Sequence, residues 1–388
     1  MVNTREELAG WLRLALTPGV GPDAARRLLA ALGPPDAIFE QGESAFRQVV
    51  SALQAKALCD APPGWHELTD ATWQWLHDSP DPAVSRAIVT LGDTDYPVTL
   101  LDIPDPPLML YALGQTAQLQ RLQAEQALAM VGSRNPTPQG AANARDFSRS
   151  LAASGLTIVS GLALGVDGAA HEGALLGAAS DKLATIAIVG TGLDRVYPRQ
   201  HRELAHQIAL RGLILSEYPL GTPPLAPNFP RRNRLISGLS QATLVVEAAL
   251  QSGSLITAKQ ALEQGRDVMA IPGSIHSAQS KGCHLLIKQG AKLVESAQDV
   301  LEELRLPDPF AQRSLALEDS PSHDDAVSNE PPEDALLHAM GHDPVSLDAL
   351  QARCGWSTAQ LQAQLLELEL MGQVGRLPGG LFQRVGTG

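Results

Sequence analysis

Short apolar runs rich in Val, Ile and Ala recur through the middle of this 388-residue chain and alternate with stretches of helical period. A strand that is buried on both faces reads as a nearly continuous apolar run, and a crossover helix must connect it to its parallel neighbour. The sequence therefore predicts an α/β domain built on a Rossmann-like, doubly wound parallel sheet. The expected strands span residues 127–131, 156–160, 185–189, 213–216, 243–246, 267–271 and 292–294.

Loops of small or turn-forming residues follow the first six of these strands, at 132–134, 161–165, 190–192, 217–219, 247–254 and 272–274. Ligands of open parallel sheets bind at the carboxyl ends of the strands, so we expect a site at these loops. Glycine backbone N–H groups and hydroxyl side chains there suit an anion such as a phosphate. The sequence holds neither GxxxxGK[S/T] nor a GxGxxG that opens the first crossover helix, so no nucleotide cofactor is expected.

The net charge of −13 by itself argues against a nucleic-acid partner. The charge is unevenly distributed, however, when it is counted separately for three segments of the chain. Residues 1–130 hold 8 Lys and Arg against 16 Asp and Glu, residues 131–305 hold 17 against 14, and residues 306–388 hold 4 against 12. Basic character is therefore confined to the middle of the chain, where a phosphate backbone would find its electrostatic footprint.

Arginines are densest at 229–234, where three fall within four positions after a proline that we expect to hold the chain extended. The alternative is a solvated charge run that starts a helix. A second basic stretch, 195–202, follows the third strand and is expected at the same edge of the sheet. Phe229 and Tyr197 belong to these two stretches, and each could either stack a nucleobase or fill the core.

The first 90 residues are expected to form a small helical domain of the SAM or helix-hairpin-helix type, because leucines flank the glycine-rich turn 18–22. Such a turn can present backbone N–H groups to a phosphate, but small bundles also use it to reverse the chain, and the second interpretation is the stronger. Residues 95–111 carry prolines that a sheet interior would not accept, so we expect an extended connection there. The α/β domain is expected at 91–305.

Residues 306–332 are polar, acidic and proline-bearing, which predicts a flexible linker. Helices are expected at 333–340, 346–353 and 357–371, the last with a capping box between Ser357 and Gln360. A hairpin between 373–377 and 381–385 completes an expected winged-helix domain at 333–388. Winged helices usually imply DNA, but the acidity of this one favours contact with another protein.

Three cysteines lie far apart in the sequence, without a CxxC pair, so neither disulfides nor a metal such as zinc is expected. No apolar run reaches the roughly 18 residues of a membrane span, and the N-terminus lacks the pattern of a signal peptide. We therefore expect a cytoplasmic protein without a membrane partner.

An enzymatic interpretation starts from Asp167 and His171, which lie four positions apart on an expected helix, so that the carboxylate could orient the imidazole. No serine or cysteine in a matching nucleophile elbow accompanies them, and a pair with this spacing often only fastens the start of a helix. We expect no catalysis.

Between residues 91 and 304 the chain resembles the DprA family of DNA-processing proteins, also called Smf. The resemblance rests on the runs DYP (95–97), PPLMLY (106–111), VGSR (131–134), SGLALGVD (160–167) followed by His171, GTGLD (190–194), NFPRRNR (228–234), SGSLIT (252–257), GRDV (265–268) and IPGS (271–274). Blocks of this length in this order do not arise by chance.

The resemblance implies sequence-independent binding and protection of single-stranded DNA, and loading of the RecA recombinase during natural transformation (competence) and DNA recombination, without catalysis. It also implies a homodimer formed through the central domain. The family's phosphate-contacting arginine falls on Arg134, whereas Leu164 stands where many members carry Lys or Arg. The expected nucleic-acid-binding residues are Gly132, Ser133, Arg134, Ser160, Gly161, Gly165, Gly190, Gly192, Arg199, Arg202, Arg232, Asn233, Arg234, Ser252, Gly253 and Ser254.

A rival hypothesis is an enzyme that acts on nucleoside monophosphates, because phosphoribohydrolases use similar Rossmann-like domains. Those enzymes show a PGGxGT loop with a catalytic Glu. Here the corresponding loop, 251–257, reads QSGSLIT, and only Glu247 remains as a candidate. A third hypothesis is a pure adaptor whose acidic terminal domains recruit proteins.

Overall fold

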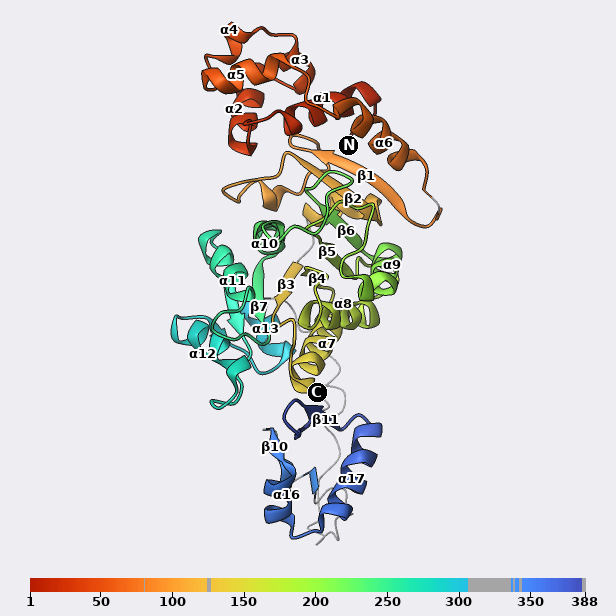
Figure 1. The fold of residues 1–388 in the computed structure, drawn as a ribbon, viewed down its shortest axis with the longest axis vertical. Helices are drawn as coiled ribbons and strands as arrows, with labels where there is room; N and C mark the ends of the chain where they lie inside the picture. Colours follow the sequence, from red (N-terminus) through yellow and green to blue (C-terminus); the bar gives the residue numbers. More distant parts are fainter. Residues whose placement is uncertain (80, 124–126, 306–335, 338, 342–343, 386–388) are drawn as a thin grey trace.

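The computed structural model describes residues 1–79, 81–123, 127–305, 336–337, 339–341 and 344–385. Within these residues a nine-stranded sheet forms the centre of the molecule, with the N-terminal helices at one end and a separate C-terminal unit at the other (Figure 1). The strands are β1 (Ser85–Thr90), β2 (Met109–Gly114), β3 (Ala127–Val131), β4 (Thr157–Ser160), β5 (Thr185–Ile188), β6 (Leu213–Ser216), β7 (Ala242–Val245), β8 (Asp267–Ala270) and β9 (Lys292–Leu293).

Parallel pairing joins the strands in the spatial order β6-β5-β4-β3-β7-β8-β9. Every strand expected from the apolar runs is present, with its ends shifted by at most one residue. The chain winds outward from β3 in one direction to β6 and then in the other to β9. The doubly wound α/β fold is thereby confirmed.

Strands β1 and β2 depart from the expectation. β2 pairs antiparallel with both β6 and β1, so the sheet already begins at Ser85, before the expected domain boundary at 90/91. The expected extended connection at 95–111 likewise ends too late, because β2 starts at Met109. The prolines that argued against a strand all precede Met109 and leave the hydrogen-bond ladder intact.

Helices cover both faces of the sheet because alternate residues of each strand point to opposite sides. Leu128 and Met130 of β3 pack in one cluster with residues of α7, α8 and α13, whereas Ala129 and Val131 pack with residues of α10, α11 and α12 on the other face. α9 packs beside β5 and β6 in a cluster shared with the N-terminal helices. These helices are α7 (Pro138–Ala153), α8 (Val166–Gly177), α9 (Arg202–Arg211), α10 (Asn228–Gly238), α11 (Ser254–Glu263), α12 (Lys281–Lys288) and α13 (Ala297–Glu303).

The N-terminal segment is helical, as expected. Between its first two helices Gly19 adopts a φ of 77°, which glycine tolerates without strain, and the chain reverses there. Trp65 ties the last helix to the first by donating its indole N–H to the carbonyl of Ala9 at 2.7 Å. The helices are α1 (Arg5–Leu16), α2 (Pro22–Leu32), α3 (Pro35–Phe39), α4 (Glu43–Phe46), α5 (Ala52–Cys59) and α6 (Trp65–His77).

The C-terminal unit contains β10 (Val345–Ser346), α16 (Leu347–Cys354), α17 (Thr358–Leu370), β11 (Val374–Leu377) and β12 (Leu381–Arg384). Its strands form a small sheet in the order β10-β12-β11, and β11 and β12 make the expected hairpin. The capping box between Ser357 and Gln360 is present at the start of α17. The expected linker at 306–332 lies outside the described residues, and of the expected helix at 333–340 only 336–337 and 339–340 are described, as helical.

In the part of the chain that the structure describes, no helix combines the length and apolarity that crossing a bilayer requires. The same residues hold no cluster of three His, Cys, Asp or Glu side chains suited to a metal ion. Cys59, Cys283 and Cys354 carry free thiols.

Glycines allow α7 and α8 to pack with their backbones close together. A Cβ at Gly173 would overlap the carbonyl oxygen of Arg145, and one at Gly177 would overlap that of Arg149. α7 starts directly after the loop that follows β3. The close contact between α7 and α8 therefore helps to fix the position of the start of α7.

We predict that Gly173→Ala lowers the free energy of unfolding by about 1–3 kcal/mol, since the added methyl group would overpack the α7–α8 contact. Leu176→Ala on the exposed side of α8 is the control, with an expected change within about 0.5 kcal/mol. Urea denaturation of the two variants measures the difference, and equal stabilities would refute the close-packing argument.

Candidate nucleic-acid interface

The carboxyl ends of β3, β4 and β7 open into a cleft of about 780 Å³. β3 lies at the switch point of the sheet, because the connections from its neighbours β4 and β7 leave toward opposite faces. Loops that diverge in this way leave a crevice where ligands of such sheets bind. The loops after β3 and β7, together with α10, form most of its walls.

The loop after β3 places one free cation at the cleft. Arg134 is exposed and makes no hydrogen bond or ion pair to any residue that the structure describes. Its guanidinium carbon lies 5.6 Å from the centroid of the Phe229 ring. Ser133 is largely buried, and its hydroxyl accepts the N–H of Asn135 at 3.1 Å, which holds the loop in shape.

The loop after β7 supplies hydroxyls and the start of a helix. Ser252 and Ser254 lie with their hydroxyl oxygens 2.6 Å apart, and both line the cleft. α11 begins at Ser254, with Gly253 as an N-cap residue that supplies no side-chain oxygen. The positive end of the α11 dipole therefore faces the cleft, which favours an anion there.

Two aromatic rings lie on the α10 side of the cleft. The ring centroids of Tyr197 and Phe229 are 5.6 Å apart, and Tyr197 is 46% exposed. Both rings line the cleft, so they are surface groups rather than core. Asn233 also lines it and accepts a hydrogen bond from the Nε of Arg232 at 2.9 Å.

The arginine-rich element corrects two expectations. Residues 228–234 form the first turns of α10 rather than an extended segment, because Pro230 sits in the first turn, where a helix needs no N–H. Arg232 is 4% exposed and donates to the carbonyls of Gly161 (2.5 Å) and Ile188, and lies 3.9 Å from Asp167. It is therefore not the free phosphate contact that the sequence predicted.

Arg234 is likewise not a free phosphate contact. It is 9% exposed and forms ion pairs with Glu217 at 2.5 Å and with Asp105 at 3.5 Å. Burial raises the pKa of the Glu217 carboxyl, and the neighbouring arginines oppose that shift. Because α10 is a helix, Arg231 is the arginine of this element that faces solvent.

The residues of the loop after β4 that were expected to contact a ligand shape the cleft instead. Ser160 is fully buried and donates its hydroxyl to the carbonyl of Met130 at 2.7 Å, so its expected role as a contact is corrected. A Cβ at Gly161 would overlap the guanidinium of Arg232. Gly165 has a φ of +83°, and its Cβ would overlap the carbonyl of Ser133. A Cβ at Gly132 would likewise meet Val166 at 2.7 Å.

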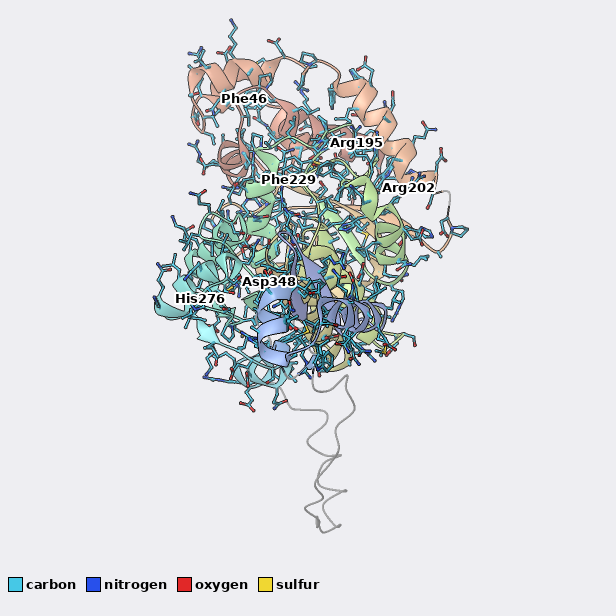
Figure 2. The ribbon with its side chains drawn as sticks, turned by 60° about the horizontal axis from the view of Figure 1, so that its bottom comes forward. Phe46, Arg195, Arg202, Phe229, His276 and Asp348 are labelled. Atoms are coloured by element: carbon cyan, nitrogen blue, oxygen red, sulfur yellow. The ribbon has the colours of Figure 1, made fainter. Side chains whose placement is uncertain are left out.

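The remaining expected residues separate into two places. Gly190 lies against Phe229 and lines a small side cavity of about 70 Å³, together with the 40% exposed Leu164. Gly192 is buried and its N–H donates to the carbonyl of Thr222 at 3.1 Å. Arg199 and Arg202 are exposed but are not among the described residues that line the cleft. Figure 2 shows Arg202 at the start of α9, away from Phe229.

The expected Asp167–His171 pair does not form. The Asp167 carboxylate accepts the N–H groups of Gly161 (3.1 Å) and Ala163 (3.3 Å), whereas Nδ1 of His171 bonds the hydroxyl of Thr185 at 2.7 Å. Burial lowers the pKa of His171 to about 3, so its ring is neutral near pH 7. Burial raises the pKa of Asp167, and the nearby Arg232 opposes that shift.

Glu247 is held at the start of α7. Its carboxylate accepts the backbone N–H of Thr137 at 2.9 Å and the hydroxyl of the same residue at 2.5 Å. Burial raises the pKa of this carboxyl. Glu247 is not among the residues that line the cleft, so the structure gives it an anchoring role.

Comparisons with known proteins agree with this architecture. A family model described as DNA recombination-mediator protein A matches residues 87–305. The chain belongs to this family, which includes the DprA and Smf proteins. A second model, the DprA winged helix domain, matches residues 320–380, which confirms the C-terminal winged helix.

Two DprA-family relatives share much of the chain. Protein Smf of Escherichia coli (strain K12) is 44% identical over 291 residues, which is 74% of each chain. Protein Smf of Synechocystis sp. (strain ATCC 27184 / PCC 6803 / Kazusa) is 36% identical over 413 aligned positions, which cover 97% of this chain and 99% of the relative.

Solved DprA structures share the fold. The X-ray structure of DNA processing protein A from Streptococcus pneumoniae has a TM-score of 0.63 at 36% identity and covers 78% of this chain and 99% of its own. A structure of the Helicobacter pylori protein, whose description concerns its single-stranded DNA binding mode, has a TM-score of 0.50 at 33% identity and covers 56% and 95%.

Several lining residues of this DprA-family cleft escaped the sequence analysis. Asn135, Gln251 and Gln279 all line it, and the amide of Gln279 donates to the carbonyl of Asn135 at 3.2 Å. Gln251 directly precedes Ser252 in the loop after β7, so it could have been proposed as a lining residue from that position. Gln279 follows β8, and no local pattern in the sequence indicates that its side chain crosses to the loop after β3.

We predict that Arg232→Ala lowers the free energy of unfolding by about 3–5 kcal/mol, because it leaves the buried Asp167 carboxylate without its cation. Arg134→Ala removes an exposed and unpaired arginine and should change stability by no more than about 0.5 kcal/mol. Chemical denaturation of both variants measures the contrast. A stable Arg232→Ala protein would return Arg232 to the set of candidate phosphate contacts.

Proposed function

We propose that this protein binds single-stranded DNA, without sequence preference, in the cleft at the ends of β3, β4 and β7. The observation that supports this most directly is the exposed Arg134, which lies over Phe229 beside Tyr197 and faces the serine loop that starts α11. A cation and a helix start suit phosphates, and adjacent aromatic rings suit bases.

The arrangement favours a single strand over a duplex. Bases of a single strand are free to turn onto Phe229 and Tyr197, whereas those of a duplex remain stacked on each other. Each of the four bases has a π face, so all of them can stack on an aromatic side chain. This accounts for the absence of sequence preference. The description of the Helicobacter pylori relative, which concerns a single-stranded DNA binding mode, supports the same ligand.

The proposal is for a binding protein rather than an enzyme on nucleoside monophosphates. The candidate Glu247 is occupied by the backbone and hydroxyl of Thr137. His171 is buried and bonded to Thr185, away from Asp167. Within the described residues, these contacts therefore leave neither the Glu247 carboxylate nor the His171 imidazole free to act as a general base at the cleft.

We expect the wild-type protein to bind labelled poly-dT more tightly than a duplex of the same length, with an affinity that falls steeply with salt. Arg134→Ala should weaken binding roughly tenfold or more and reduce the slope of log K against log salt by about 0.7, the value for one phosphate contact on a single strand. Fluorescence anisotropy at several salt concentrations measures both quantities.

The matched control is Arg149→Ala, which removes the same charge from an exposed position of α7 outside the cleft. Its affinity should stay close to that of the wild type. Phe229→Ala should weaken binding while leaving the salt slope unchanged, because stacking releases no counterions. Equal effects of Arg134→Ala and Arg149→Ala would move the site elsewhere, and equal binding to single strand and duplex would reject the proposed ligand.

We also propose that two copies pair through the far edge of the central sheet, beside β9. An apolar groove of about 610 Å³ lies there, and its exposed side chains include Leu250, Ile275, Leu285 and Leu293. β9 is only two residues long and ends the sheet, so another chain can cover this edge without displacing a strand. An apolar surface of this kind is typical of the core of a homodimer interface.

Ile275→Asp, which places a charge in this groove, is expected to convert a dimer into monomers of 41.1 kDa, as measured by light scattering after size-exclusion chromatography. Leu262→Asp, at an exposed position of α11 outside the groove, is the control and should remain dimeric. A dimer that persists in Ile275→Asp but dissociates in Leu262→Asp would place the interface on α11.

Protection of the bound strand and its transfer to the RecA recombinase during natural transformation complete the proposal, with the cytoplasm as the place of action. The description of the matching family, a mediator of DNA recombination, supports this role. The acidic winged helix then provides a surface for contact with another protein.

A further inference from the structure

The hairpin of β11 and β12 forms the wing of the C-terminal domain, and the face of this wing that points away from the domain's core is buried. Val374 and Phe382 point into the core of the winged helix, so the neighbouring cross-strand pair, Gly375 and Gln383, points away from it. A polar side chain on the outer face of a hairpin normally meets water. Gln383 is nevertheless only 7% exposed, so something outside the winged helix covers it.

The cover is the start of α7. Contacts join α7 to both β11 and β12, and Figure 1 shows β11 next to α7. A Cβ at Gly375 would lie 2.5 Å from Cβ and Cγ of Pro138, closer than side chains approach each other. The φ of Gly375 is not positive, so its backbone does not require glycine. The close approach of Pro138 is therefore the physical reason for glycine inside this strand.

This contact lies at the rim of the cleft. Pro138 is the first residue of α7 and follows the loop in which Arg134 and Asn135 line the cleft. The bonds from Thr137 to Glu247 hold the end of that loop in place. The wing thus rests on a fixed support only a few residues from the free arginine.

We propose that the winged helix docks on the start of α7 as an intramolecular cover, and that its docked position competes with single-stranded DNA for the rim of the cleft. This inference rests on the proposed function, and it describes how the winged helix would regulate the binding of single-stranded DNA. The winged-helix domain, residues 333–388, carries 6 acidic against 3 basic side chains, so the docked domain brings net negative charge toward the path of the phosphates. DNA binding and docking then oppose each other, and a partner that holds the winged helix elsewhere would strengthen DNA binding.

The test uses the full chain with Gly375→Val. Valine suits a strand, points away from the winged-helix core and collides with Pro138, so it should undock the domain without unfolding it. The affinity for labelled poly-dT should then rise about tenfold, the gain expected if about one wild-type molecule in ten is undocked. Hydrogen exchange at the first amides of α7 should also accelerate.

Two further variants keep the result interpretable. Ala359→Val adds the same side chain at an exposed position of α17 and should change neither affinity nor exchange. Pro138→Leu enlarges the other side of the contact and leaves the winged helix unaltered, so it should reproduce the effect of Gly375→Val even if that variant damages the wing.

Each other outcome overturns the inference in a distinct way. Weaker DNA binding in both contact variants would mean that the wing helps to hold the strand. Unchanged affinity with faster exchange would mean that the wing docks without covering the DNA path, and unchanged exchange would mean that it does not dock in solution. A wild-type protein that binds no single strand would reject the proposed function, and with it the competition, while the exchange data would still report the docking.

Discussion

The buried guanidinium of Arg232 holds the candidate site together. It joins α10 to the ends of β4 and β5 through the carbonyls of Gly161 and Ile188, and its charge is balanced by Asp167 at the start of α8. Removing such a cation from the interior is costly because a buried carboxylate would remain unpaired. Phe229 lies one helical turn before Arg232, on the same side of α10, so the contact that anchors the helix also sets the ring over the cleft.

The chain combines strong overall acidity with a locally basic cleft. Several arginines of the central domain are neutralised internally, as Arg234 is by Glu217 and Asp105. Arg134 remains unpaired within the described residues, and it lies where the N-terminus of α11 adds a partial positive charge. Repulsion from distant carboxylates is screened over about 8 Å at physiological salt, so the local arrangement decides what binds.

Most glycines of the strand-end loops are explained by packing rather than by a ligand. Gly132 makes room for Val166, Gly161 for Arg232 and Gly165 for the backbone of Ser133. The sequence pattern located these loops correctly, because small residues at the ends of parallel strands mark where the chain must turn closely. It could not separate glycines that admit a neighbouring side chain from those that expose an N–H group to a phosphate, since both uses require the absence of a Cβ.

The sequence by itself determined the seven parallel strands and their order along the chain, the doubly wound fold and the edge of the sheet that carries the loops, because apolar period and turn residues are local properties. Tertiary structure alone decided which arginines are free. The sequence predicted phosphate contacts for Arg134 and Arg232 alike, yet one reaches solvent and the other is buried against two carbonyls and Asp167. Tertiary structure also brought Gly375 against Pro138. The pairing of a charge, or the covering of a strand, depends on residues far away in the chain, and no local pattern records them.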